Sequence, residues 1–173
     1  MGMVDQAVIN FACYEDAKDF LGLASVTLPD VDFIVATVSG AGIAGNVEAP
    51  IIGHMNAMIT QIKFRTFSAE SLKLQEPREH NIDLRAPQQV YDPIAGVYKT
   101  QSVKHVLVLV PKTLSNGNIA PASPTDGSGS YAVRRWVTYI DDAKVMELDP
   151  YNYICEVNGV DYLSDTRKAL GKS

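Results

Sequence analysis

The feature that most constrains this fold is a period of two in the side-chain pattern. In residues 57–67, apolar side chains alternate with polar ones, and residues 131–140 divide between two faces in the same way. Successive side chains of a β-strand point to opposite faces, so both segments predict strands. Residues 106–110 form a continuous apolar run, which is typical of a strand covered on both faces. We expect Pro111 to end that strand, because proline cannot donate a ladder hydrogen bond.

Turn residues separate the predicted strands. The pair Asn158-Gly159 is a strong hairpin signal, because a type I′ turn needs a positive φ at both central positions. Residues 141–144 and 92–96 also predict turns. Residues 14–21 leave two alternatives open: the start of a helix, or the tip of a hairpin between strands at 8–13 and 19–28. Short connections of this kind favour antiparallel pairing.

Helical signals are few. Residues 68–75 begin with a plausible N-cap, Ser68, and stop before Pro77, while residues 164–170 predict a second short helix with Gly171 just past its end. Two stretches rich in glycine and proline, 37–53 and 111–130, predict long loops. The 173 residues thus predict a single domain over 1–173, mainly β: an antiparallel sandwich or barrel with one short central helix and a short C-terminal helix.

Charge is unevenly distributed along the chain. The chain has 20 acidic and 15 basic residues, and residues 1–62 hold seven of the acids but only one base, Lys18. A net charge of −5 without a cluster of basic residues is unfavourable for gripping duplex DNA. No run of 18 apolar residues and no N-terminal signal pattern occurs, so we expect neither stable membrane binding nor secretion.

A glycine-rich segment spells the motif G-x-G-x-x-G after a strand-like stretch, with Gly40, Gly42 and Gly45 as its glycines. In a dinucleotide site these glycines open a helix whose N-terminus holds the pyrophosphate. Here Pro50 follows closely and the next regular segment alternates like a strand. A flexible or tightly packed glycine loop is therefore favoured over a nucleotide-binding enzyme that uses Gly40 to Gly45.

The histidines and cysteines show no pattern of a site. His54, His80 and His105 are not spaced as metal ligands, so we expect surface or core histidines. Cys13 and Cys155 could form one disulfide, but without a secretion signal two reduced, partly buried thiols are favoured.

Three aspartates and three tyrosines have alternative interpretations. The aspartates Asp141, Asp142 and Asp149 fit turns better than a calcium loop. The tyrosines lie near the Asn-Gly turn and suit either core packing or an interface: Tyr151, Tyr153 and Tyr162. The sequence thus offers no catalytic, cofactor-binding or metal-ligating residues, and we predict that the chain is not an enzyme and works through contacts with proteins.

Three segments, in order, carry a resemblance to a known family. Residues 22–29 read Gly-Leu-Ala-Ser-Val-Thr-Leu-Pro, and residues 39–45 are followed by an acidic and proline-containing stretch at 47–50. Residues 152–163 are the most specific segment, followed by Arg167 and Gly171. With these segments the chain resembles the major tail tube protein of contractile-tailed bacteriophages, whose relatives form R-type pyocins and similar contractile injection particles.

The resemblance implies a structural role without cofactors. Subunits of that family form hexameric rings that stack into a hollow tube inside a sheath, and their inner strands join into one barrel around the lumen. The implied partners are further copies of the chain, the sheath protein, and baseplate and tail terminator proteins, with DNA only as passing cargo in a phage. The implied location is a virion tail or contractile particle assembled in the host bacterial cytoplasm.

Two expectations depend on the resemblance. The segment from Gly40 to Gly45 becomes a candidate loop for packing between subunits. An acidic lumen would repel phosphates, and Asp5, Asp30 and Asp32 are candidates to line it.

A second function is also open for this chain. Instead of a structural tube subunit, the chain could be a monomeric β-barrel that binds a small ligand.

Overall fold

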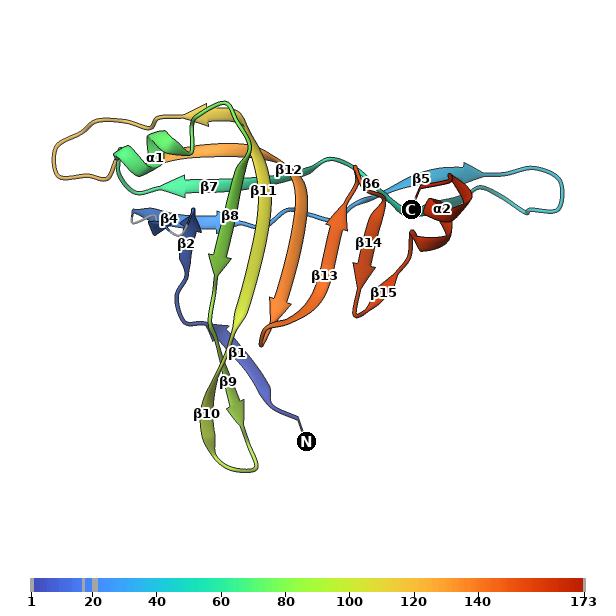
Figure 1. The fold of residues 1–173 in the computed structure, drawn as a ribbon, viewed down its shortest axis with the longest axis horizontal. Helices are drawn as coiled ribbons and strands as arrows, with labels where there is room; N and C mark the ends of the chain where they lie inside the picture. The colour runs from blue at the N-terminus through green and yellow to red at the C-terminus, as the bar shows by residue number, and fades with distance from the viewer. Residues whose placement is uncertain (1, 17, 20–21, 173) are drawn as a thin grey trace.

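The computed structural model describes residues 2–16, 18–19 and 22–172, which contain fifteen strands and two short helices (Figure 1). Every strand pair is antiparallel. The predicted mainly antiparallel β fold with two short helices is therefore confirmed. The elements are β1 (Val4–Val8), β2 (Ala12–Glu15), β3 (Lys18–Asp19), β4 (Leu23–Thr27), β5 (Phe33–Val38), β6 (Val47–Met55), β7 (Met58–Phe64), α1 (Ala69–Lys73), β8 (His80–Arg85), β9 (Gln88–Asp92), β10 (Val97–Gln101), β11 (Val103–Ser115), β12 (Gly127–Ile140), β13 (Ala143–Asp149), β14 (Ile154–Val157), β15 (Val160–Asp161) and α2 (Ser164–Ala169).

One long hairpin, β11–β12, connects two sheets. Residues 127–133 of β12 pair with β7, whereas residues 136–140 pair with β13. On the other side, β8 pairs only with residues 104–109 of β11. We call β4, β7 and the adjoining halves of β12 and β11 sheet I, and the order β3-β2-β8-β11-β12-β13-β14-β15 sheet II. Register shifts in β11 and β12 mark bulges, which bend the hairpin from one sheet into the other.

The core lies between the two sheets. Ile62 and Tyr131 of sheet I meet Ile82 and Leu107 of sheet II in one buried cluster. Burial also raises the pKa of Tyr131 to about 12, because the phenolate would be poorly solvated there. A sandwich of this kind needs one inward face on each sheet, and the strict alternation of buried and exposed residues along β7 supplies it.

The two cysteine side chains belong to this core. Cys13 is 1% exposed on β2 and Cys155 is 3% exposed on β14. Both are present as buried thiols, as the sequence predicted. Burial raises the pKa of the Cys155 thiol, which lowers its reactivity as a nucleophile.

The predicted turns are confirmed. Asn158 and Gly159 have φ values of 51° and 82°, the combination that a type I′ turn requires. Asp141 and Asp142 also have positive φ, at 48° and 64°, between β12 and β13. The turn between β9 and β10 closes with a hydrogen bond of 2.8 Å from the Gly96 N–H to the carbonyl oxygen of Asp92.

Replacing Gly159 with valine is expected to lower the free energy of unfolding by about 1–3 kcal/mol, because a β-branched residue resists positive φ. Nothing lies within 4 Å of a Cβ built on Gly159, so the cost comes from the backbone alone. Thermal unfolding measures this loss. The matched control is Gly159→Asn, since asparagine tolerates the same conformation. Equal melting temperatures for the wild type and Gly159→Val would contradict the type I′ assignment.

Both helices predicted from the sequence are present, and their ends lie at the predicted capping residues. Ser68 caps α1, and its side chain accepts from the N–H of Ser71 while the Ser71 hydroxyl accepts from the Ser68 N–H. At the other end of the chain, α2 stops before Gly171, whose φ is 71°. None of the helices in the described part of the chain is long and apolar enough to cross a membrane.

Two predictions from the sequence are wrong, and the structure decides between the two alternatives left open for residues 14–21. β11 does not end at Pro111, which pairs with Tyr131 inside the strand. Proline is tolerated there because β8 pairs with β11 only as far as Leu109, so the other side of Pro111 lies at a sheet edge. Strands also occupy much of both predicted loops, whose irregular parts are only 39–46 and 116–126. For residues 14–21 the hairpin alternative is correct, with β2 paired to β3, while residues 17, 20 and 21 lie outside the described residues.

Candidate assembly surfaces

The β5–β6 hairpin projects from the body of the molecule. We call residues 33–55 the β5–β6 arm. Its two strands pair only with each other, from Phe33 opposite Met55 to Val38 opposite Val47. Figure 1 shows the arm reaching beyond the sandwich at the end opposite α1. An isolated two-stranded hairpin is marginally stable in water, so an arm of this length suits a segment that other protein covers.

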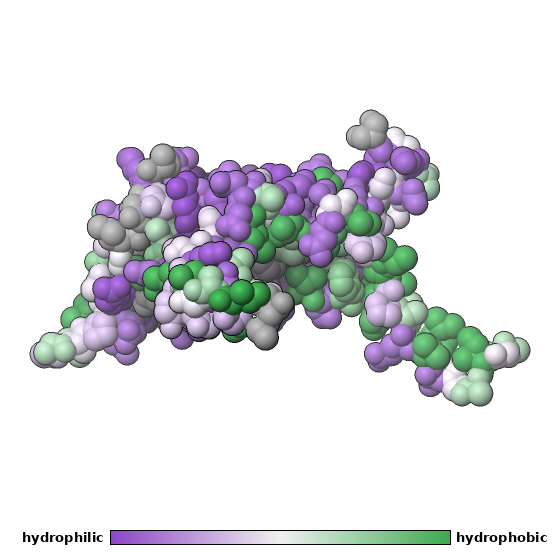
Figure 2. All heavy atoms as spheres, turned by 90° about the horizontal axis from the view of Figure 1, so that it is seen from below, coloured by the Kyte–Doolittle hydropathy of each residue, from purple (hydrophilic) through white to green (hydrophobic). Residues whose placement is uncertain are grey.

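The surface of the β5–β6 arm is largely apolar. Seven of its apolar side chains are exposed: Phe33, Val35, Val38, Ile43, Val47, Ile51 and Ile52. Figure 2 shows hydrophobic residues gathered over this projection. Residues 19–62, which include the arm, contain no lysine or arginine. Concentrated exposed apolar surface of this kind marks a contact site for another macromolecule.

The glycine motif forms the tip of the arm. Gly40, Gly42 and Gly45 have φ values of 128°, 89° and 132°, and the N–H of Ile43 bonds to the Gly40 carbonyl oxygen at 3.1 Å. The motif is followed by strand β6 and not by a helix. A dinucleotide cradle of the Rossmann type, which needs a helix N-terminus at this point, is therefore contradicted by the structure.

The base of the arm is fixed by the segment 152–163 and α2. The backbone at Gly53 has φ of 67°, and a Cβ built there would lie 2.5 Å from Cγ of Leu163. Leu163 thus packs directly against the arm backbone. One arginine then holds α2 in place, since Arg167 lies 2.6 Å from an Asp161 carboxylate oxygen and donates to the Tyr153 carbonyl oxygen at 2.6 Å. The most specific of the three segments that carry the resemblance, 152–163, therefore supports the arm.

The interactions of the Asp161 carboxylate at the base of the arm are expected to stabilise the fold less in acid. Burial raises the pKa of Asp161, but hydrogen bonds from Arg167 and from the Leu163 N–H outweigh it, so the pKa lies below its ordinary value of 3.8. A lowered pKa stabilises the fold above the unfolded-state pKa of about 4, and this contribution is lost as the pH falls through the folded-state value.

The variant that tests this pH dependence is Arg167→Met, which removes the ion-pair partner of Asp161. Its deficit in unfolding free energy is expected to be about 1 kcal/mol larger at pH 6 than at pH 3, while the lost bond to Tyr153 costs the same at both. Urea titrations at the two pH values measure this difference. Lys168→Met, on the neighbouring exposed position, is the control. A pH-independent deficit would show that the ion pair does not stabilise the fold.

A second projection consists of β1, β9 and β10. We call these three strands, which pair in the order β1-β9-β10, the β9–β10 arm. The rings of Tyr91 and Tyr98 lie 5.2 Å apart on it. Its exposed apolar side chains, with those of the residues next to β1, are Met3, Val4, Val8, Ile9, Ile94, Val97 and Tyr98. The subunit therefore carries two separate apolar projections.

The histidines occupy core and surface positions, as predicted. His54 is exposed, and His105 bonds to the hydroxyl of Thr138 at 2.9 Å. His80 is fully buried, with Nδ1 2.8 Å from a Glu15 carboxylate oxygen and Nε2 2.9 Å from the Glu76 carbonyl oxygen. This cluster joins β2 to β8, and sequence analysis missed it because 65 residues separate its two partners. Among the described residues, no three His, Cys, Asp or Glu side chains gather as a metal site would require.

The aspartate and tyrosine candidates from the sequence also divide between buried and surface positions. Asp149 is buried and accepts hydrogen bonds from Asn152, so it stabilises a turn as predicted. Tyr151 and Tyr162 are 73% and 54% exposed, which favours an interface for these two, whereas Tyr153 is half-buried.

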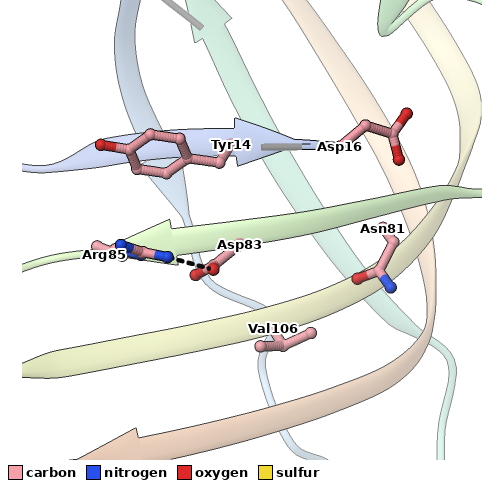
Figure 3. Close-up of a pocket in the computed structure, with 6 residues that line it drawn as sticks. All are labelled: Tyr14, Asp16, Asn81, Asp83, Arg85 and Val106. Atoms are coloured by element: carbon pink, nitrogen blue, oxygen red, sulfur yellow. Dashed lines mark hydrogen bonds and ion pairs between the residues drawn. The ribbon is translucent and has the colours of Figure 1, made fainter. Parts of the chain in front are cut away.

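A polar groove crosses the outer face of β2, β8 and β11 (Figure 3). Arg85 lies 3.1 Å from an Asp83 carboxylate oxygen and 4.9 Å from the ring centre of Tyr14. None of the described residues that line it, including Asn81 and Val106, is a cysteine, serine or histidine. Its described lining is thus an ion pair with neighbouring polar side chains on the outer face of the sheet.

Known proteins share the fold of this chain, and one family model matches its sequence. The chain resembles, in fold, the sheath/tube terminator of an extracellular contractile injection system, PVC, in its extended state, with a TM-score of 0.53, 12% identity and coverage of 76% of this chain and 94% of that one. It also resembles a chain of the PVC sheath-tube complex in the extended state, with a TM-score of 0.52, 11% identity and coverage of 75% and 87%. No curated protein matches the sequence. The model of the family of phage tail tube protein FII, a structural protein, matches residues 5–171. The chain belongs to that family of phage tail tube proteins.

Proposed function

We propose that this chain is the subunit of an inner tube, which assembles into hexameric rings that stack around a lumen. The observation that carries the proposal is the β5–β6 arm, on which seven apolar side chains stay 38% to 70% exposed in the single subunit. Burial of apolar surface contributes about 25 cal/mol per Å², so covering the arm with other copies supplies much of the assembly free energy. Contacts between unlike surfaces of identical subunits generate closed rings or extended filaments, which are the two elements of a stacked tube.

The tube acts within a contractile particle. Its fold neighbours come from a sheath-tube complex and a sheath/tube terminator, which supports a sheath protein and a terminator as partners of this chain. A baseplate protein is the partner at the end of the tube opposite the terminator. Contraction of the sheath drives the tube through a target envelope, and DNA or an effector then passes along the lumen. Assembly takes place in the host bacterial cytoplasm, from subunits that each fold as one domain, have no enzymatic role and do not bind membranes stably.

Size-exclusion chromatography followed by negative-stain electron microscopy tests this proposal. Purified chain at high concentration is expected to form rings or hollow tubes. A species that stays strictly monomeric would overturn the proposal and would favour a ligand-binding β-barrel instead. Stabilisation of the chain by added nucleotide would be required to revive the enzyme alternative.

The loop at 116–126 is expected to contribute to contacts between subunits or with the sheath. Its base is ordered by hydrogen bonds from the Asn118 N–H to the Thr125 carbonyl oxygen and from the Thr125 N–H to the Arg65 carbonyl oxygen. Ile119 between them is fully exposed. Replacing residues 119–123 with a short glycine-serine linker should leave the melting temperature within about 2 °C of the wild type but reduce tube yield or sheath binding severalfold. Equal losses of folding and assembly would count against an interfacial role.

A further inference from the structure

The chain contains two Asn-Gly pairs, Asn116-Gly117 and Asn158-Gly159, and the asparagine is exposed in both. An asparagine followed by glycine has a specific reactivity. The backbone nitrogen of the glycine can attack the side-chain amide carbon of the asparagine, because glycine has no Cβ to obstruct the approach. The two pairs have the same local chemistry, so a difference between their reaction rates must come from the fold.

The reaction is a deamidation in two steps. In the first, the glycine nitrogen loses its proton and forms a bond to Cγ of the asparagine, while the Cγ–Nδ2 bond breaks and ammonia leaves. The product is a cyclic imide. In the second step, water opens the ring at either carbonyl carbon. One opening gives aspartate, and the other gives isoaspartate, in which the main chain runs through Cβ and Cγ and is longer by one methylene group.

The fold restrains Asn116. Its Oδ1 accepts a hydrogen bond from Nε2 of Gln75 at 2.8 Å, which fixes the side-chain amide. The backbone that follows is crowded, because a Cβ built on Gly117 would collide with the carbonyl oxygen of Thr125. The N–H of Asn118 also donates to that oxygen at 2.9 Å. Ring closure needs rotation of both the side chain and the backbone, so at Asn116 several contacts would have to break together.

The surroundings of Asn158 are more open. Its side chain makes no hydrogen bond to any residue that the structure describes. Nothing lies within 4 Å of a Cβ built on Gly159. The turn lies at the edge of sheet II, where β14 pairs with the two residues of β15 (Figure 1). A short edge pair opens at little cost in free energy, so this turn reaches the geometry of ring closure more often than residues 116–117 do.

We propose that Asn158 is a site of spontaneous deamidation and that the fold protects Asn116 from the same reaction. The isoaspartate product adds a methylene group to the main chain of a two-residue turn. The turn then no longer matches the pairing of β14 with β15, which depends on the type I′ geometry. This modification needs only water as a co-reactant, and it goes beyond the proposed tube function.

The modification acts on the base of the β5–β6 arm. The strand that follows the turn, β15, ends at Asp161, whose carboxylate lies 2.6 Å from Arg167. Two residues later Leu163 packs against the backbone of Gly53. A displaced β15 therefore disturbs both contacts, and deamidation of Asn158 loosens the support of the arm.

Peptide mapping by mass spectrometry tests the assignment. The folded chain is incubated at mildly alkaline pH, because base removes the glycine amide proton, and samples are digested at intervals. The peptide with Asn158 is expected to convert to aspartate and isoaspartate about tenfold or more faster than the peptide with Asn116. In urea, where the contacts of the fold are lost, the two rates should be similar. Equal rates in the folded chain, or no conversion at Asn158, would overturn the proposal.

Gln75→Ala tests the protection of Asn116. This variant loses the hydrogen bond to the Asn116 side chain, so conversion at Asn116 should become severalfold faster while conversion at Asn158 is unchanged. An unchanged rate at Asn116 would overturn the protective role of Gln75.

Thermal unfolding tests the effect on the arm. The isoaspartate form is purified from aged protein and compared with Asn158→Asp, which has the same charge without the additional methylene group. The isoaspartate form is expected to melt about 2–5 °C lower. Asn158→Gly, aged in parallel, is the matched control, because a Gly-Gly pair also fits a type I′ turn and cannot deamidate. Equal melting temperatures for the isoaspartate form and Asn158→Asp would overturn the proposed loosening of the arm.

Discussion

Two acidic substitutions on the β5–β6 arm, Val35→Asp and Val47→Asp, are expected to abolish tube assembly while the subunit remains folded. Both valines are about half exposed in the single subunit, at 48% and 53%, so the core loses little when they change. Because each valine is already half buried, covering the rest in a tube would contribute about 1 kcal/mol each, and an unpaired carboxylate in an apolar contact adds a larger desolvation penalty. Since about 1.4 kcal/mol corresponds to a tenfold change in affinity, each substitution should weaken a contact at least tenfold.

Sedimentation and electron microscopy of the double variant measure assembly, and circular dichroism with thermal unfolding measures the fold. Val35→Ile with Val47→Ile is the matched control, because it keeps the surface apolar and should still form tubes. Normal tubes from the aspartate variant would show that the arm is not an assembly surface. A melting temperature lowered by more than about 5 °C would instead place the effect within the subunit.

The second large effect is expected at the base of the arm. Gly53→Ala should lower the free energy of unfolding by about 2–4 kcal/mol, because it combines a positive φ with a Cβ only 2.5 Å from the Leu163 side chain. Leu163 is 6% exposed, so Leu163→Ala alone is expected to cost about 2–5 kcal/mol through a cavity.

A double-mutant cycle separates steric collision from backbone strain. In the double variant Gly53→Ala with Leu163→Ala the added methyl group occupies space that the leucine has vacated. Its total loss should be smaller than the sum of the two single losses by about 1 kcal/mol or more, leaving mainly the cost of positive φ. Urea titrations of the four proteins measure the coupling. Strict additivity would show that the arm backbone and Leu163 do not press against each other.

Much of the fold could be predicted because its signals are local. The alternation along residues 58–64 and the Asn158-Gly159 turn each act through neighbouring residues, and both predictions are confirmed. Pro111 was misjudged because its effect depends on which neighbouring strand is present. Local sequence shows that a proline lacks a donor, but it does not show that β8 stops before reaching it.

The assembly surfaces were less predictable for a related reason. Residues 33–38 have the composition of a buried strand, and apolar strand residues usually face a core within the same chain. Here the rest of the subunit does not cover these side chains, so the same pattern produces an exposed arm. The glycines at its tip fit a phosphate motif by spacing alone, and only the strand that follows them separates the two interpretations.

The continuity of β11 and β12 through both sheets has a mechanical consequence. A load applied to one sheet passes along two unbroken strands into the other sheet. The interstrand hydrogen bonds between β11 and β12 resist this load together, in shear, along most of the length of the two strands. Relative sliding of the sheets would require these bonds to break as a group, whereas separate sheets joined only by loops would slip at the side-chain contacts. The subunit is thus built as a stiff block that deforms little under an applied load.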